Sequence, residues 1–250
     1  MFIFTFFFDR KEIFSAKKNL NFEKMKMKTL PYIIIKNIKS NKTNLFKNLS
    51  LFCEHFILKN AYTNLISKKT TSFLYKIHLL DALTLMAFIK VFWPRKKKYI
   101  CLDMGTGGGF PGLILALFTP NFFFFLLDSV NKKTQFHEKI ILINKMKNCF
   151  SICFRAEKIN NNKMYKKSLD IIFSRAMADL PFLIQLCLPF CNFNSKILVM
   201  KKIHESSEEI KKSLFFLNLL KGKLKSILFI NPEKKGKMII IIKINVTNFI

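Results

Sequence analysis

The residues best suited to bind a ligand form a glycine cluster near the middle of the chain. Five of the seven glycines lie between residues 105 and 112, in the string DMGTGGGFPG that begins at Asp103. This string follows a short apolar run and precedes a helical pattern, which is the setting of a nucleotide-binding turn. Glycine has no Cβ, so it adopts positive φ and lets a ligand approach the backbone. The cluster therefore predicts a nucleotide-binding loop that includes Gly105 and Gly107.

The spacing within the cluster separates the classes of nucleotide. A P-loop is excluded, because no Lys-Ser or Lys-Thr follows the last glycine. A dinucleotide fingerprint has a glycine at its sixth position, where this chain has Phe110. The string instead follows D-x-G-x-G-x-G, and Asp103 would repel a pyrophosphate but suit an ammonium and a sulfonium. S-adenosylmethionine carries both charges, so we favour this methyl donor over NAD as the cofactor.

An acid and two arginines follow other predicted strands. Asp128 ends the second strand, where its carboxylate can accept hydrogen bonds from ribose hydroxyls in either cofactor class. Only four of the 43 basic residues are Arg, and Arg155 and Arg175 follow the third and fourth predicted strands. A guanidinium offers a planar fork of donors that lysine cannot imitate. We therefore expect Arg175 to face a ligand, whereas Arg155 is equally consistent with a solvated surface position.

The high net charge is only weak evidence for a particular binding partner. A formal charge of +28 is typical of proteins that bind nucleic acid or an anionic membrane. However, Lys, Asn, Ile and Phe dominate this chain, and all four have A/T-rich codons, so codon bias alone could produce the charge. The basic stretches that could bind phosphates are residues 95–98, 132–133, 166–167 and 221–225, of which the first two flank the predicted site.

Several classes of protein are disfavoured by the rest of the composition. No apolar run reaches the roughly 18 to 20 residues of a membrane span, and the N-terminus lacks the features of a signal peptide. The six cysteines form no C-x-x-C pair and the four histidines are not at ligand spacing, which disfavours a zinc site. We expect a cytoplasmic protein without a metal, with reduced cysteines in its core, including Cys101, Cys153 and Cys187.

The elements that must position these residues alternate between strand and helix. From residue 99 onward this alternation predicts a mainly parallel twisted sheet covered on both faces, and the short final connection predicts an antiparallel C-terminal strand. The fold class is therefore α/β and Rossmann-like, preceded by N-terminal helices. We divide the chain into a poorly specified basic arm (1–42), a helical region (43–95) and the catalytic domain (96–250). The predicted strands are 99–103, 122–128, 149–154, 169–174, 196–201, 225–231 and 237–245, and the predicted helices are 44–59, 72–92, 113–118, 131–147, 179–190 and 205–220.

Several motifs together resemble one family of bacterial enzymes. They are residues 61–67 (AYTNLIS), 78–83 (HLLDAL), 103–112 (DMGTGGGFPG), 127–133 (LDSVNKK), 155–157 (RAE) and 174–178 (SRAMA). Over roughly residues 45 to 202, this order is similar to that of the glucose-inhibited division protein B family. The resemblance implies a class I S-adenosylmethionine-dependent methyltransferase that modifies guanine N7 in the 16S rRNA of the small ribosomal subunit.

The resemblance also implies site residues. Gly105 and Phe110 would hold the cofactor in the glycine loop, Ala156 and Glu157 would lie beside the adenine, and Arg175 would face both the cofactor and the substrate pocket. Lys201 matches a family lysine. The chain departs from the family where it has Asn131 and Lys202 in place of glycines, and Ile66 in place of the threonine of Asn-Leu-Thr.

The implied chemistry needs no catalytic acid or base. Guanine N7 has a lone pair and no proton, so the protein has only to align the reactants and exclude water. On a helix, His78 and Asp81 share a face, which favours a structural hydrogen bond or an RNA contact over acid–base catalysis. Two alternatives stay open: a methyltransferase of the same fold that acts on another RNA base or a small molecule, and a degenerate RNA-binding relative. We expect a monomer.

Overall fold

The computed structural model describes eight stretches of the chain. They are residues 43–66, 78–93, 98–159, 168–175, 177–202, 207–219, 223–230 and 237–243. The predicted basic arm (1–42) and the first turns of the helix predicted at 72–92 lie outside the described residues. The division of the chain at residues 42 and 95 stays a prediction.

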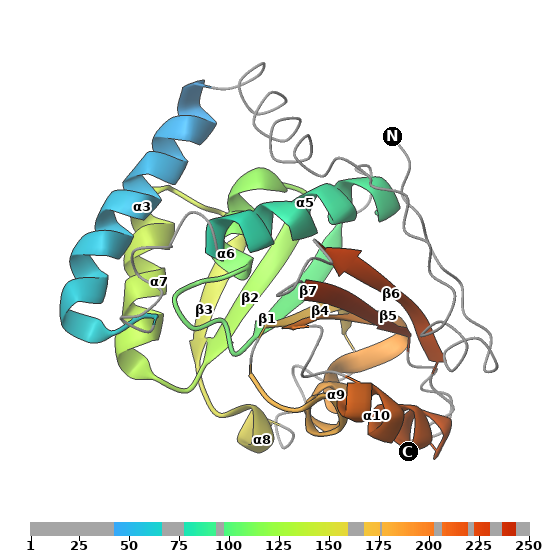
Figure 1. Ribbon diagram of the computed structural model, residues 1–250. Helices are drawn as coiled ribbons and strands as arrows, with labels where there is room; N and C mark the ends of the chain where they lie inside the picture. The colour runs from blue at the N-terminus through green and yellow to red at the C-terminus, as the bar shows by residue number, and fades with distance from the viewer. Residues whose placement is uncertain are drawn as a thin grey trace.

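A seven-stranded sheet forms the centre of the molecule (Figure 1). Its strands are β1 (Tyr99–Met104), β2 (Phe122–Asp128), β3 (Cys149–Cys153), β4 (Leu169–Arg175), β5 (Cys191–Lys202), β6 (Lys223–Ile230) and β7 (Lys237–Lys243), in the order β3-β2-β1-β4-β5-β7-β6. Strands β1 to β5 are parallel, and β7 runs antiparallel to both of its neighbours. The predicted mainly parallel sheet with an antiparallel C-terminal strand is therefore confirmed.

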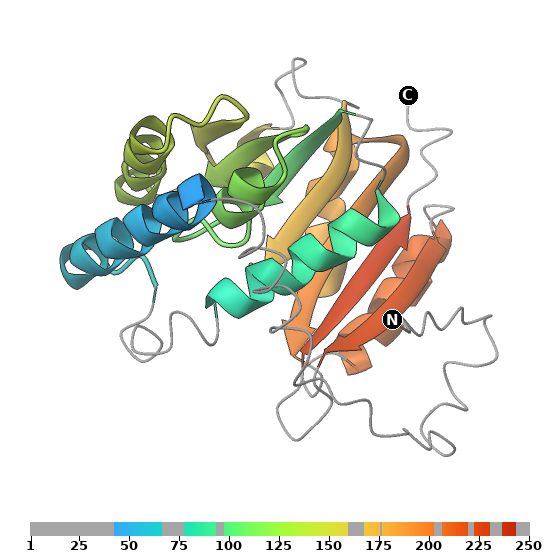
Figure 2. The same cartoon turned by 90° about the horizontal axis from the view of Figure 1, so that it is seen from above.

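Helices cover both faces of the sheet, as Figure 2 shows from above. One face is covered by α3 (Thr43–Thr63), α5 (Leu80–Phe92), α6 (Gly112–Phe118) and α7 (Asn131–Ile143), and the other by α8 (Ala156–Ile159), α9 (Leu180–Cys187), the short 3-10 helix η3 (Leu188–Phe190) and α10 (Ser207–Leu219). Successive strand residues point to opposite faces, so β7 gives Ile239 and Ile241 to the first core and Ile240 and Ile242 to the second. Both faces are buried, which is why this strand is apolar at successive positions. Within the described ranges, no helix combines the length and the apolar character needed to cross a membrane.

Helix α7 ends four residues before the predicted boundary at residue 147. Lys145 adopts a φ of 50°, and its backbone N–H donates to the Leu142 carbonyl while that of Met146 donates to the Ile141 carbonyl. This pair of bonds is the Schellman arrangement that closes a helix. Lysine stands where glycine is usual, so the sequence pattern missed the stop.

Strand β5 begins five residues earlier than predicted, at Cys191. The Asn192 side chain donates to the Leu169 carbonyl at 3.2 Å, and Ser195 Oγ donates to the same oxygen at 2.5 Å. These bonds tie a polar segment of low strand propensity to the start of β4. Tertiary contacts therefore extend the strand beyond its apolar part.

The expectation of core cysteines is wrong for one residue. Five of the six cysteines are buried and free, but Cys153 is exposed at the end of β3. Burial raises the pKa of the Cys191 thiol to about 12 and raises that of Cys187 well above its ordinary value. These two thiols are therefore protonated at neutral pH and serve as small core residues.

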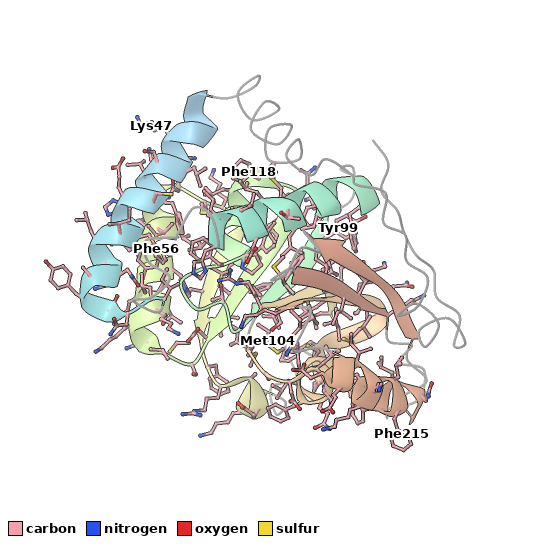
Figure 3. All side chains as sticks on the ribbon, in the orientation of Figure 1. Lys47, Phe56, Tyr99, Met104, Phe118 and Phe215 are labelled. Carbon is pink, nitrogen blue, oxygen red and sulfur yellow. The ribbon has the colours of Figure 1, made fainter. Side chains whose placement is uncertain are left out.

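Aromatic packing joins α3 to the glycine loop. Phe56 is fully buried, and its ring centroid lies 5.6 Å from that of Phe52, 5.4 Å from that of Phe110 and 5.6 Å from that of Phe136. Figure 3 shows Phe56 directed from α3 into the body of the molecule, whereas Phe215 on α10 points outward. The N-terminal helix α3 thus shares one core with the sheet.

We predict that Phe56→Ala destabilises the protein by about 3 to 5 kcal/mol, because it removes a buried ring and leaves a cavity. Urea unfolding measures the difference. Tyr62→Ala on the same helix is the matched control, since Tyr62 is 87% exposed, and its effect should stay within about 0.5 kcal/mol. Equal losses for the two variants would contradict the packing described for α3.

Candidate cofactor site

The predicted site residues gather at the carboxyl ends of the parallel strands. The strand order reverses at β1, because β2 and β3 lie on one side of it and β4 and β5 lie on the other. Ligands of open α/β sheets bind at such a switch point. The glycine loop leaves β1 here and enters α6 at Gly112, so the loop lies between the ends of β2 and β4.

Three loop glycines adopt backbone conformations that favour glycine, with φ values of +72° at Gly105, +61° at Gly107 and +91° at Gly109. A Cβ on Gly105 would come within 2.8 Å of the Met177 side chain, whereas a Cβ on Gly107 would have only the Gly105 carbonyl oxygen near it, at 4.0 Å. The backbone at Gly107 therefore faces open space, which is the cradle that a ligand can enter without meeting a side chain.

Asp103 holds the loop from below. Its side chain is fully buried, and its Oδ2 accepts a hydrogen bond from Thr106 Oγ1 at 2.6 Å and from the Gly112 backbone N–H at 2.7 Å. Burial raises the pKa of this carboxyl to about 6, while the two hydrogen bonds and Arg175 lower it. Its other oxygen, Oδ1, is buried and has no hydrogen-bond partner among the described residues. The suitability of this acid for a positively charged ligand stays a prediction, and the structure adds that the carboxyl supports the loop.

Asp128 holds the loop from the side. Its Oδ2 accepts from the Gly107 N–H at 2.9 Å and lies 3.7 Å from Lys133 Nζ, and its Oδ1 accepts from the Val130 N–H at 2.9 Å. These contacts fix the carboxylate at the end of β2. A carboxylate has about four lone-pair sites, so the geometry leaves capacity for the ribose hydroxyls that the sequence predicts as its partners.

His137 on α7 is a site residue that the sequence reasoning missed. It is fully buried, and its Nε2 lies 2.8 Å from the Gly107 carbonyl oxygen, so this nitrogen carries the proton and donates. Burial lowers the pKa of His137 to about 4, and the ring is neutral at physiological pH. The sequence does carry a signal for this residue. His137 is polar but lies beside Phe136 on the side of the helix that packs against the core. Gly107 is thus held through its N–H by Asp128 and through its carbonyl by His137.

Arg175 forms a second group with three other residues. Its Nη1 donates to Asp81 Oδ2 at 3.1 Å and its Nη2 donates to His78 Nδ1 at 2.5 Å. Its guanidinium carbon lies 5.8 Å from the centre of the Phe110 ring, which is itself 5.4 Å from the His78 ring. His78 and Asp81 were expected to make a structural hydrogen bond or an RNA contact; the structure brings both of them to Arg175. The Phe110 side chain faces this group and the core.

The remaining predicted residues follow β3. Ala156 is buried and Glu157 is exposed, both in α8, which lies beyond the end of β3 (Figure 1). The Phe154 N–H donates to the Asp128 carbonyl at 3.0 Å and so ties this segment to β2. Arg155 is exposed, which matches the surface alternative for it.

Lys201 fixes the segment that follows Arg175. Its Nζ donates to the Ala178 carbonyl at 2.5 Å and lies 2.8 Å from Glu209 Oε2, which also accepts from the Leu180 N–H at 3.0 Å. This segment carries Met177 against Gly105. Across the described ranges, no three metal-ligating side chains gather into a group that could hold a metal ion.

Comparison with known proteins identifies the family. Residues 45–236 match the family described as GidB, rRNA small subunit methyltransferase G. This chain belongs to that family. The rRNA small subunit methyltransferase G of Clostridium kluyveri is 29% identical over 186 residues (74% of this chain, 76% of that protein). The protein of the same name from Acetivibrio thermocellus is 33% identical over 173 residues (68% and 69%).

Solved structures place this family member among S-adenosylmethionine-dependent methyltransferases by fold. A SAM-dependent methyltransferase from Aquifex aeolicus matches with a TM-score of 0.52 and 12% identity, covering 68% of this chain and 92% of that one. The crystal structure of M. jannaschii TYW2 in complex with AdoMet matches with a TM-score of 0.50 and 16% identity, covering 67% of this chain and 74% of that one. At such identity the likeness concerns the fold alone. The predicted family and fold class are confirmed.

We predict that Gly107→Ala weakens binding of S-adenosylmethionine at least tenfold, about 1.4 kcal/mol, because the methyl group would occupy the open face of the loop. The free protein should lose only about 1 to 2 kcal/mol of stability from the positive φ. Calorimetric titration and urea unfolding measure the two effects. Lys145→Ala, at a position outside the loop that also has a positive φ, of 50°, is the control and should leave the affinity unchanged. Unchanged affinity in Gly107→Ala would contradict the cradle.

We predict that His137 makes the protein less stable as the pH falls. The folded pKa is about 4 and the ordinary value is 6.5, so between these values the unfolded state binds the proton first and stability decreases on acidification. From pH 7.5 to 5 this contribution is about 2 kcal/mol. His137→Gln keeps an N–H donor but does not titrate. Between the two pH values, the free energy of unfolding measured with urea should fall by about 2 kcal/mol less in the variant than in the wild type. Equal decreases would contradict a buried, neutral His137.

Proposed function

We propose that this chain transfers a methyl group from S-adenosylmethionine to N7 of a guanine in 16S rRNA of the small ribosomal subunit. The observation that carries the proposal is the open backbone at Gly107, held beside the Asp128 carboxylate in a chain of this family. A backbone cradle next to a fixed acceptor suits a nucleoside with free ribose hydroxyls. The residues present therefore fit the methyl donor.

The cofactor would be held by four segments at the strand ends. The glycine loop would contribute Gly105, Gly107 and Phe110, with the Phe110 side chain turned into the core. Asp128 would accept from the ribose. The segment after β3 would place Ala156 and Glu157 at the adenine, and Arg175 would close the site from the end of β4. Hydrogen bonds to Asp128 join the first three segments, and Arg175 lies against the Phe110 ring.

The chain acts by alignment rather than by proton transfer. When bound, S-adenosylmethionine supplies an electrophilic methyl group, and guanine N7 needs no base to react with it. The described histidines of the site agree with this chemistry: His137 is buried and neutral, and His78 Nδ1 is occupied by Arg175. The fixed loop, the carboxylates and the guanidinium orient the reactants and exclude water.

The proposed partner is 16S rRNA, either free or within the small subunit. We propose that the protein acts as a monomer in the cytoplasm. Among the basic stretches, Lys98 and Lys132 are exposed, and Lys133 lies against Asp128. Residues 95–97, 166–167 and 221–222 lie outside the described residues. Lys132 follows the carboxyl end of β2, where its ammonium can bind a phosphate and help to orient an RNA substrate. Lys98 directly precedes β1 and so lies at the amino ends of the parallel strands. The expectation that the stretch 95–98 flanks the site is therefore wrong for Lys98.

We predict one methyl group incorporated per unmodified small subunit when the protein is incubated with radiolabelled S-adenosylmethionine. Cleavage of the rRNA at N7-methylated guanines maps the target. Label elsewhere in the rRNA would favour another base, and cofactor binding without label in rRNA would favour a small-molecule substrate. Failure of the protein to bind the cofactor would favour the degenerate RNA-binding alternative. Small subunits that already carry the methyl group are the control and should take up no label.

A further inference from the structure

We propose that Asp81 and His78 are positioning residues that act through Arg175, so that the N-terminal helical region completes the active site. This inference rests on the proposed function, in which Arg175 faces the cofactor and the substrate. His78 lies two residues before α5 and Asp81 lies in its first turn, whereas Arg175 ends β4. The contacts therefore join two parts of the chain that are almost a hundred residues apart.

The geometry constrains the guanidinium in two directions. Asp81 Oδ2 accepts from Nη1 and His78 Nδ1 accepts from Nη2, so both arms of the planar fork are engaged. The Phe110 ring lies beneath it, with the guanidinium carbon 5.8 Å from the ring centre. Two hydrogen bonds and one ring contact leave a planar cation little freedom to rotate. A guanidinium has five N–H donors, so this arrangement can hold it while other donors serve a ligand.

The ion pair between Arg175 and Asp81 is largely buried and lies close to the glycine loop. The side chains of Arg175 and Asp81 are 16% and 12% exposed, so water screens the pair only weakly. Arg175 also lowers the pKa of Asp103 beneath the glycine loop, because its positive charge favours the carboxylate. Phe110 belongs to that loop. A shift of the guanidinium would therefore change both the field and the shape at the place where the cofactor and the base must meet.

Lysine could not replace Arg175 in this arrangement. An ammonium is a point charge with no planar fork, so it cannot hold the two acceptors and stack on Phe110 in one orientation. The chain keeps one of its four arginines here although 39 lysines stand elsewhere. A simple surface ion pair would not need this residue type.

A double-mutant cycle separates positioning from a purely structural role. The proteins are wild type, Asp81→Asn, Arg175→Lys and the double variant, each assayed for kcat/KM on unmodified small subunits and for thermal stability. If Asp81 acts through Arg175, each single variant loses about tenfold and the double variant also loses about tenfold, because the second change removes an interaction already lost. Asp81→Glu keeps the carboxylate and should stay within about threefold of wild type. A double variant that loses the product of the single effects would overturn the proposal, as would a fully active Asp81→Asn.

A control variant on α5 and a pair of His78 variants complete the test. Thr84→Ala on α5 removes a hydrogen bond to the Leu80 carbonyl without touching Arg175, and its kcat/KM should be unchanged. If Asp81→Asn does not fold, His78→Gln and His78→Leu replace it. The glutamine oxygen can accept from Nη2 and should preserve activity within about threefold, whereas leucine cannot and should lose about tenfold. Equal activities of these two variants would overturn the role of His78.

The inference and the proposed function fail in different ways. Absence of methyl transfer to rRNA by the wild-type protein would refute the function. In that case the dissociation constant for S-adenosylmethionine would be measured for the same four proteins of the double-mutant cycle. Non-additive losses of affinity would still support positioning through Arg175, and additive losses or none would overturn it.

Discussion

The structure depends on how the backbone of a loop with five glycines is held in one shape. Glycine loses more conformational freedom on folding than other residues, and buried backbone polar groups must find partners. Here three side chains from outside the loop supply them. Asp103 accepts from the Gly112 N–H, Asp128 accepts from the Gly107 N–H, and His137 donates to the Gly107 carbonyl. The loop is therefore shaped by its surroundings.

This constraint links the sheet to the layers around it. Asp103 and Asp128 reach the loop because β1 and β2 are parallel neighbours in a register that pairs Asp103 with Leu126 and brings their carboxyl ends together. His137 reaches it because α7 packs on the same face as α6. The aromatic cluster around Phe110 then connects the loop to α3, and Arg175 connects it to the start of α5. The N-terminal helices are thereby joined by direct contacts to the glycine loop and to Arg175.

Local patterns predicted the elements well where apolar runs were continuous, as in β2, whose bounds agree with the prediction. They did worse where a polar residue had a distant partner. Asn192 and Ser195 extend β5 through bonds to Leu169, and Lys145 ends α7 in a conformation more usual for glycine. In the site, the sequence placed Asp103 beside the glycine loop but did not indicate that its Oδ2 holds the loop through Thr106 and Gly112. Such outcomes depend on contacts between segments, which no local pattern contains.

By itself the sequence determined the position of the glycine loop and the alternating α/β architecture, because glycine clustering and apolar periodicity are properties of short segments. The order of its motifs also determined the family. Only the tertiary structure decided which groups hold that loop and that Arg175 meets His78 and Asp81, more than ninety residues away. It also decided that His137 is buried and neutral, since desolvation depends on everything packed around a side chain. The chemistry of the site is readable from residue types, but its alignment is a property of the folded chain.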